Sequence, residues 1–458
     1  MWVRSASGKR YSARFPVMTL PAHYQAFLDA PRPPSPMWAW LPASEEAPTA
    51  TAAMSALTAR FGAGLTLEMV ARPTAPGATW ELTCTLPEGR VFSVWAMRSE
   101  KLEALHLQHD HEVLTPAERE ALEKSVWSLG VVLTFGDQPL DDFHFQVRAL
   151  IALAPSAVAA FDVAAYRLHH AEWLKESALS AATPSPTSLF VMHFVSDEGK
   201  PGWLHTHGLD RCGRLELELF DITPDASRLL SELVNSTAAF FLEQGLPAPG
   251  EPVAVGRDLP LLWLPWEDAL SRKKPKFGGG RDDRDEVHGN PTAVLFAPAR
   301  KFLGFFGSGL ASPSSHLPVL QGSPILYVSN AMTRRMELLS RERLPTLKAL
   351  FGKLGGNAQF KFLVKLGYPT VDADQYGSRE HIWFEVHSFG GEHVDATCIN
   401  QPHSVPALQE GLRGLHELTL ITDWTIFCPV GRFDAERVGL LVHVLDSAPD
   451  ALRMQLGL

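Results

Sequence analysis

The chain has 458 residues, 45% of them hydrophobic and 20% charged, which allows substantial buried cores and predicts about three domains. Its formal charge of -10 argues against nucleic acid as a partner, because phosphate backbones attract basic surfaces. The four cysteines lack C-x-x-C spacing, which argues against a disulfide framework and a cysteine zinc site and favours reduced thiols in the cytoplasm.

No segment predicts a membrane span or an export signal. The most apolar run, residues 149–161, is interrupted by Pro155 and is much shorter than the roughly 20 residues that cross a bilayer. The basic residues near the N-terminus are not followed by the apolar stretch of a secretory signal. We therefore expect a cytoplasmic protein without a membrane partner.

Residues 1–182 are predicted to form an N-terminal α+β module. The alanine-rich residues 51–60 favour a helix that Gly62 ends. Thr115-Pro116-Ala117-Glu118 is a capping box with proline at the first helical position, and it predicts a helix up to Gly130. Apolar runs bounded by turn residues predict an antiparallel meander and then a strand, at 65–70, 79–85, 91–97 and 131–135. A buried helix or strand and a short helix are predicted at 145–153 and 172–178.

Residues 183–270 are predicted to form a second α+β module. It begins with apolar residues 189–195, and the runs W-L-H-T-H-G and 215–220 are expected to pair with them as strands. Thr223-Pro224 starts a helix with one apolar stripe, which Gly245 ends.

Residues 271–292 are predicted to be a flexible linker. The segment contains a basic run, three consecutive glycines and a run of mixed charge, a composition that cannot bury apolar surface. A phosphate-binding loop is the less favoured alternative, because the segment lacks the Walker spacing.

Residues 293–458 are predicted to form the third module. A strand at 324–328 is followed by a helix that Asn330 caps and that Pro345 interrupts. A strand follows at 360–366, and then a hairpin whose arms are 381–388 and 393–399. The predicted fold class is therefore α+β and multi-domain, with small, mostly antiparallel sheets, packed helices and a hairpin-rich C-terminal module. A small barrel and an α+β sheet both fit this last module.

The C-terminal module carries the most specific motif of the chain. It combines an E-H-x-W strand, an N-x-P turn and a D-W pair: Glu380, His381, Trp383, Asn400, Pro402, Asp423 and Trp424. This pattern resembles DUF2314, an uncharacterised bacterial family, over about fifty residues. The resemblance implies a bacterial source and a family, but it brings no activity.

A second resemblance covers residues 140–270. The run W-L-H-T-H-G-L at residues 203–209 and the W-L-P-W run from Trp263 to Trp266 carry it. They are similar to bacterial domains of the DUF4026 or DUF4261 type, which again imply no reaction.

The best metal candidate is the pair His205 and His207. Alternate residues of a strand point to the same side, so both imidazoles share one face. A third donor has to come from elsewhere, and Asp210, Cys212 or a distant histidine all fit. The favoured alternative is structural, a hydrogen-bonded strand face made of Trp203 and the two histidines.

The polar face of the C-terminal hairpin is the second candidate site. His381, Trp383, Glu385 and His387 alternate with apolar residues, and a tryptophan flanked by titratable groups suits a binding surface. The binding candidates here are Glu380, His381 and Trp383. A purely structural pattern is the favoured alternative. Asp423 is expected to cap a turn and Trp424 to pack across the sheet, although both are also binding candidates.

Other chemical signatures are weak. Residues 109–112, H-D-H-E, place four potential ligands before a helix, but acidic residues there also complement the helix dipole. Ser308 lacks the G-x-S-x-G frame, and no catalytic triad can be assigned.

These observations lead to two functional hypotheses. The first is a non-catalytic binding or interaction protein, of an accessory or immunity type, with a protein partner and no predicted cofactor. The alternative is a metal-dependent hydrolase that uses His205, His207, a third ligand and a divalent metal. The sequence leaves open whether the protein is an enzyme.

Overall fold

The computed structural model describes residues 18–105, 114–284, 288–299, 309–322, 326, 329–371, 379–447, 454 and 456–457. The fold is α+β, as predicted, and its three sheets are open. The chain forms two compact units, Met1–Leu179 with Pro184–Ser329, and Ser180–Thr183 with Asn330–Leu458. Among the described residues, no helix has both the length and the apolar character needed to cross a bilayer.

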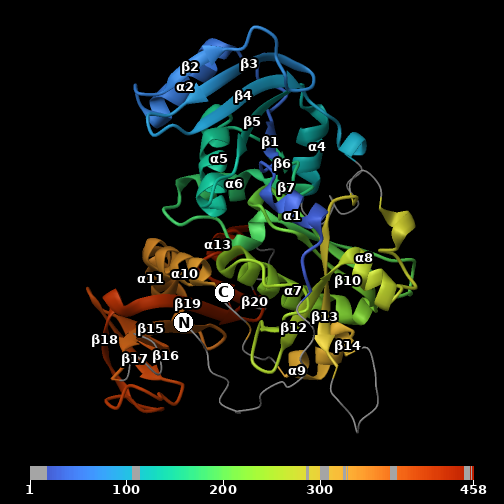
Figure 1. Cartoon of the computed structure of the whole chain (residues 1–458). Helices are drawn as coiled ribbons and strands as arrows, with labels where there is room; N and C mark the ends of the chain where they lie inside the picture. The colour runs from blue at the N-terminus through green and yellow to red at the C-terminus, as the bar shows by residue number, and fades with distance from the viewer. Residues whose placement is uncertain are drawn as a thin grey trace. The chain divides into compact units, whose positions relative to one another are not determined.

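The first unit contains two sheets, and the first of them is wholly antiparallel (Figure 1). Its strands are β1 (Pro34–Trp40), β2 (Thr66–Met69), β3 (Ala78–Thr85), β4 (Val91–Arg98), β5 (Trp127–Thr134), β6 (Ala159–Asp162) and β7 (Arg167–His170). They follow the order β2-β3-β4-β5-β1-β6-β7, which confirms the predicted meander of β2, β3 and β4.

Helices cover both faces of this sheet. They are α2 (Ala50–Phe61), α5 (Pro139–Leu153) and α6 (Ala171–Leu179), which pack on one core, and α4 (Pro116–Lys124), which packs on another. The hydroxyl of Thr49 caps α2 by accepting from the N–H of Ala52, and Gly62 ends the helix in a conformation with φ 90°. The predicted capping box of α4 is present at Thr115 and Glu118.

The predicted helix from residue 116 to 130 is too long. Helix α4 ends at Lys124, and β5 begins at Trp127. The backbone of Gly130 is paired with β1 and β4 instead, opposite Trp38 and Trp95. A Cβ atom at Gly130 would lie 2.2 Å from the indole of Trp95, so this strand position requires glycine. Tertiary pairing therefore overrides the local helical pattern.

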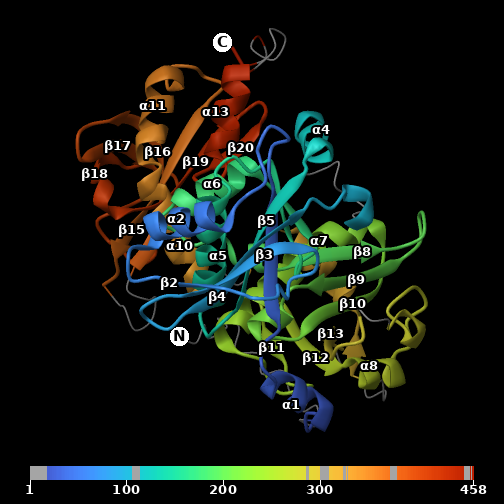
Figure 2. The same cartoon turned by 90° about the horizontal axis from the view of Figure 1, so that it is seen from above.

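The second sheet carries the W-L-H-T-H-G strand. Its strands are β8 (Val191–Val195), β9 (Gly202–His207), β10 (Glu216–Ile222), β11 (Val253–Ala254), β12 (Pro260–Pro265), β13 (Thr292–Pro298) and β14 (Leu310–Ala311). The order is β11-β12-β13-β10-β9-β8 (Figure 2). Strand β14 pairs with β13. Strand β13 is parallel to β10 and antiparallel to β12. The compact units thus divide at Ser329, whereas the predicted third module begins at residue 293.

Both faces of the second sheet are covered. The helices of this region are α1 (Ala22–Asp29), α7 (Pro224–Gln244), α8 (Trp266–Arg272) and α9 (Leu317–Gln321). Helix α7 packs Leu230 and Leu233 onto the face that carries Leu204 and Leu217. Helix α8 packs onto the other face, which carries Trp203.

The described residues of the predicted linker pack on the second sheet. The carboxylate of Asp221 accepts the backbone N–H groups of Lys276 and Phe277, at 2.8 and 3.2 Å. The guanidinium of Arg284 makes a bidentate ion pair with Glu218, at 2.5 and 2.7 Å, and both side chains are buried. The segment that was predicted to be exposed therefore has buried anchors on β10.

Within its described residues, the second unit contains one antiparallel sheet and three α-helices. Its elements are α10 (Asn330–Glu342), α11 (Leu344–Leu354), β15 (Lys361–Pro369), β16 (Arg379–Phe389), β17 (His393–Cys398), β18 (Arg413–Glu417), β19 (Ile421–Cys428), β20 (Gly431–Asp434) and α13 (Val438–Ser447). The order β18-β17-β16-β15-β19-β20 leaves two edges, so this module is an open α+β sheet and not a barrel. The predicted hairpin corresponds to β16 and β17.

Candidate functional site

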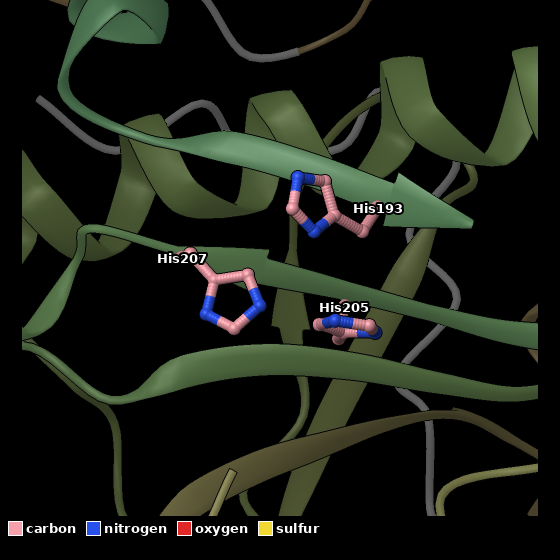
Figure 3. A group of neighbouring side chains, drawn as sticks. All are labelled: His193, His205 and His207. Carbon is pink, nitrogen blue, oxygen red and sulfur yellow. The ribbon is translucent and has the colours of Figure 1, made fainter. Parts of the chain in front are cut away.

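Two neighbouring strands of the second sheet bring three histidines together. His205 and His207 alternate on β9, and both therefore point to one face. Strand β8 pairs with β9 so that His193 lies directly opposite His205. Figure 3 shows the three imidazole rings grouped around one space beside these strands.

The geometry of this three-histidine cluster suits a metal ion. One ligand atom from each ring lies within 4.8 Å of the other two. A tetrahedral zinc ion with bonds of about 2.0–2.1 Å would hold its ligand atoms roughly 3.3 Å apart. The ligand atoms would therefore have to approach one another by about 1 Å or more to bind such an ion.

His205 is the residue whose environment is hardest to explain without a ligand. It is 3% exposed, and neither of its ring nitrogens has a hydrogen-bond partner. Leaving a buried polar group unsatisfied costs about 1–3 kcal/mol, and each such case calls for a physical reason. Burial, followed by the nearby His207, lowers the pKa of His205 to about 2. The ring is thus neutral, which is the form that binds a metal.

Two further rings adjoin the cluster. The ring of His288 lies 4.9 Å from that of His205 and 5.1 Å from that of His207, measured between centroids. The indole of Trp203 lies 4.0 Å from the ring of His205. His288 belongs to the segment before β13, so a segment far along the chain brings a fourth imidazole to the same place.

His205 and His207 line a cavity of about 410 Å³. Its wall also contains Tyr166, Asp210, Glu216, Glu218 and Asn290, and the lining residues that the structure describes include no lysine or arginine. Its carboxylates have fixed partners. Glu216 accepts from the hydroxyl of Thr206 and from three backbone N–H groups of the loop after β9, and Glu218 pairs with Arg284. These acids hold the loop and the segment that surround the histidines.

Of the three alternatives for a third donor, the structure groups a distant histidine, His193, with His205 and His207. Cys212 is 2% exposed in the hydrophobic core, and burial raises the pKa of its thiol to about 12, so the thiolate that a metal needs is disfavoured. Asp210 lines the cavity, and its carboxylate accepts the N–H of Arg211 at 2.7 Å. His193 stands in an ordinary apolar strand, V-M-H-F-V, and only the strand register identifies it.

The C-terminal motif residues make structural contacts. The carboxylate of Glu380 accepts the backbone N–H groups of His403 and Ser404, each at 2.7 Å. The side-chain oxygen of Asn400 accepts the N–H of Trp383 at 2.9 Å. The E-H-x-W strand and the N-x-P turn thus hold each other in place.

The D-W pair is buried. Trp424 is 0% exposed, and its indole N–H donates to the carbonyl of Ser340 at 3.1 Å, so it packs in the core as the sequence favoured and is not part of a surface. Asp423 is 5% exposed and lies 3.6 Å from the ammonium of Lys365. The Lys365 ammonium also lies 4.7 Å above the half-buried ring of Trp383.

The histidines of β16 do not form a cluster. His381 hydrogen-bonds the hydroxyl of Thr422 at 2.9 Å, and His387 bonds that of Thr397 at 2.7 Å. Within the part of the chain that the structure describes, His193, His205 and His207 form the one group that could hold a metal. Residues 109–112 and Ser308 lie outside the described residues.

Comparison with known proteins gives three family matches. Residues 37–184 match the N-terminal model and residues 192–296 the C-terminal model of a protein of unknown function, DUF4026. Residues 357–434 match DUF2314, described as an uncharacterized protein conserved in bacteria. No curated protein and no solved structure matches the chain. The three-histidine cluster and His288 all fall within residues 192–296.

Proposed function

This chain carries both regions of the DUF4026 family followed by a DUF2314 region, and we propose that its DUF4026 part is a metal-dependent hydrolase. The metal is a divalent transition ion, held by His193, His205 and His207. The single observation that carries this proposal is the buried ring of His205, whose two nitrogens have no hydrogen-bond partner.

The choice of metal follows from the ligands. Neutral imidazoles suit zinc and the neighbouring transition ions, whereas calcium and magnesium prefer oxygen. Three protein ligands are typical of catalytic zinc sites, in which water takes the fourth position. His205 and His207 line the cavity of about 410 Å³, so a substrate would have room beside a metal that they hold.

The proposed reaction is hydrolysis of a neutral acyl bond. A metal held by His193, His205 and His207 would supply a water of lowered pKa as the nucleophile for the carbonyl carbon. The bond from this carbon to the leaving group would break, and the proton of that water would pass to the leaving group. A phosphate ester is a poorer substrate for this site, because the described residues that line the cavity include no lysine or arginine and Arg284 is neutralised by Glu218.

Metal content is the decisive measurement. The purified full chain is stripped with a chelator, incubated with excess zinc, desalted and measured by elemental analysis. We expect about one equivalent for the wild type and less than about a tenth for His205→Ala and His193→Ala. His387→Ala is the matched control and should keep the full equivalent of zinc. His387 lies on β16, where it hydrogen-bonds the hydroxyl of Thr397, and it is not part of the three-histidine cluster. A wild type that retains less than about a tenth of an equivalent defeats the proposal.

Activity is measured on the zinc-loaded chain with p-nitrophenyl acetate and p-nitrophenyl phosphate. Acetate hydrolysis that depends on His193 supports a hydrolase. A full equivalent of metal without any hydrolysis of either ester would reduce the proposal to metal binding alone.

The interaction-protein hypothesis has weaker support. Of its two C-terminal tryptophans, Trp424 is fully buried, and only Trp383 remains half-buried next to Lys365. His381 already has a partner on β19, and Glu380 has partners in the loop after β17.

A further inference from the structure

The cavity beside the three-histidine cluster is shared between the two DUF4026 regions. Val163, Ala164 and Tyr166 line it from the turn between β6 and β7, within residues 37–184. Its other lining residues, among them His205 and His207, fall within residues 192–296. Both regions belong to the first compact unit, so the N-terminal region supplies part of the wall beside the candidate metal ligands.

Buried contacts hold this turn against the loop that follows β9. Asp162, the last residue of β6, makes a bidentate ion pair with Arg211 at 2.7 and 2.8 Å, and both side chains are 0% exposed. A Cβ atom at Gly208 would lie 3.2 Å from that of Ala165, so the loop and the turn approach each other closely. The position of Tyr166 relative to β9 is therefore fixed by packing within one unit.

Tyr166 occupies a backbone conformation that tyrosine rarely adopts. Its φ is 47°, in the left-handed region that favours glycine and, among the other residues, asparagine and aspartate. A non-glycine residue in this region is strained, and such residues cluster at functional sites. Glycine would close the same turn without this strain. The turn by itself thus gives no reason for a tyrosine.

The phenol of Tyr166 is available to a ligand in the cavity. Its ring centroid lies 5.5 Å from that of His207 and 6.5 Å from that of Phe161. Tyr166 is 38% exposed, and none of the described residues makes a hydrogen bond with its hydroxyl. A phenol hydroxyl both donates and accepts hydrogen bonds. The wall beside His207 therefore carries a neutral donor that the protein does not use itself.

We propose, on the basis of the hydrolase function above, that Tyr166 contacts the substrate. Its hydroxyl donates a hydrogen bond to the carbonyl oxygen of an acyl group bound beside the three-histidine cluster, and the proton stays on the phenol. Negative charge develops on that oxygen when water attacks the carbonyl carbon, and a donor that is already in place stabilises it. The N-terminal DUF4026 region thereby contributes to the reaction at the histidines of the C-terminal region.

Binding of acetohydroxamate to the zinc-loaded full chain tests this contact without turnover. This small acyl compound chelates zinc through its oxygens, and its carbonyl oxygen would accept from Tyr166. We expect Tyr166→Phe to weaken binding at least about fivefold in a calorimetric titration, which corresponds to the loss of one hydrogen bond. Zinc content should stay at the wild-type value. Tyr368→Phe is the matched control and should leave the affinity unchanged, because Tyr368 lies in the second unit, bonded to His416.

A second variant and the rate of hydrolysis extend the test. Tyr166→Asn keeps a residue that tolerates the left-handed conformation but lacks the phenol, and it should weaken hydroxamate binding as Tyr166→Phe does. With p-nitrophenyl acetate, Tyr166→Phe should lower kcat at least about tenfold and change KM less, because the contact strengthens as charge develops.

The outcomes separate the role of Tyr166 from the metal site. A wild type that takes up no zinc defeats the hydrolase proposal and the role of Tyr166 together. A zinc-loaded wild type that binds acetohydroxamate no more tightly than both Tyr166 variants overturns the role of Tyr166 alone. An unchanged kcat in Tyr166→Phe overturns it as well.

Discussion

Strands β9 and β16 carry similar motifs, and the structure treats them differently. Both alternate tryptophan and histidine on one face, and both are interior strands of their sheets. On β16, the outward histidines are bonded to threonine hydroxyls. On β9, every residue is buried, and the ring of His205 has no hydrogen-bond partner.

The difference comes from what lies over each face. Helix α8 and the residues up to Arg284 pack on the face of β9 that carries the histidines. The polar face of β16 keeps half-exposed and exposed side chains. On β9, in contrast, a third histidine on the neighbouring strand lies opposite the pair, and the side chains are buried.

The largest expected effect is a loss of stability in the second unit, which contains β16. Trp424→Ala removes a fully buried indole and its bond to Ser340, and we expect it to destabilise the second unit by about 3–5 kcal/mol. Hydrogen exchange of β15 peptides checks this, because it reports on that unit alone. Trp383→Ala is the control and should cost clearly less. Equal losses of unfolding free energy in the two variants would contradict this prediction, because they would mean that the half-buried Trp383 contributes as much to the core as Trp424 does.

Metal binding should stabilise only the region of β9. At free zinc one hundred times the dissociation constant, we expect about 2.7 kcal/mol of added stability. Hydrogen exchange of peptides from β8 and β9 measures this gain. It should vanish in His205→Ala and persist in His381→Ala. Zinc-dependent protection of β16 peptides instead would mean that the metal binds at β16 and not at β9.

Glu380→Gln tests whether the C-terminal motif is structural. The amide keeps one acceptor for the N–H groups of His403 and Ser404 but loses the charge, and we expect a loss of about 1 kcal/mol in unfolding free energy. This loss is measured by urea unfolding that is monitored by hydrogen exchange. Zinc content should stay at the wild-type value, and a change in it would link the motif to the metal.

Asp423 gives the smallest expected effect, which depends on pH. Burial, partly offset by Lys365, raises the pKa of this carboxyl in the folded protein. Its protonated form is therefore favoured by folding, and this contribution is full below the unfolded pKa of about 4. The contribution is lost as pH rises through the folded value. The stability of wild type relative to Asp423→Asn should thus fall as pH rises from 4. Urea unfolding of both proteins at several pH values measures this difference, and a rise with pH would contradict the prediction.

Much of the fold is readable from local pattern. The capping box at Thr115, the hairpin of β16 and β17, and the shared face of His205 and His207 each depend on residues a few positions apart. The end of α4 is not readable in this way, because Gly130 is taken into the sheet by β1 and β4. The place of β13 in the second sheet also depends on partners far along the chain.

The sequence by itself determined the α+β class, the periodic strands and two of the three clustered histidines, because side-chain direction along a strand is a local property. Only the tertiary structure decided that His193 faces His205, that His288 reaches them and that Trp424 is buried. Strand register and coverage arise from contacts between distant residues, and no short-range pattern specifies them.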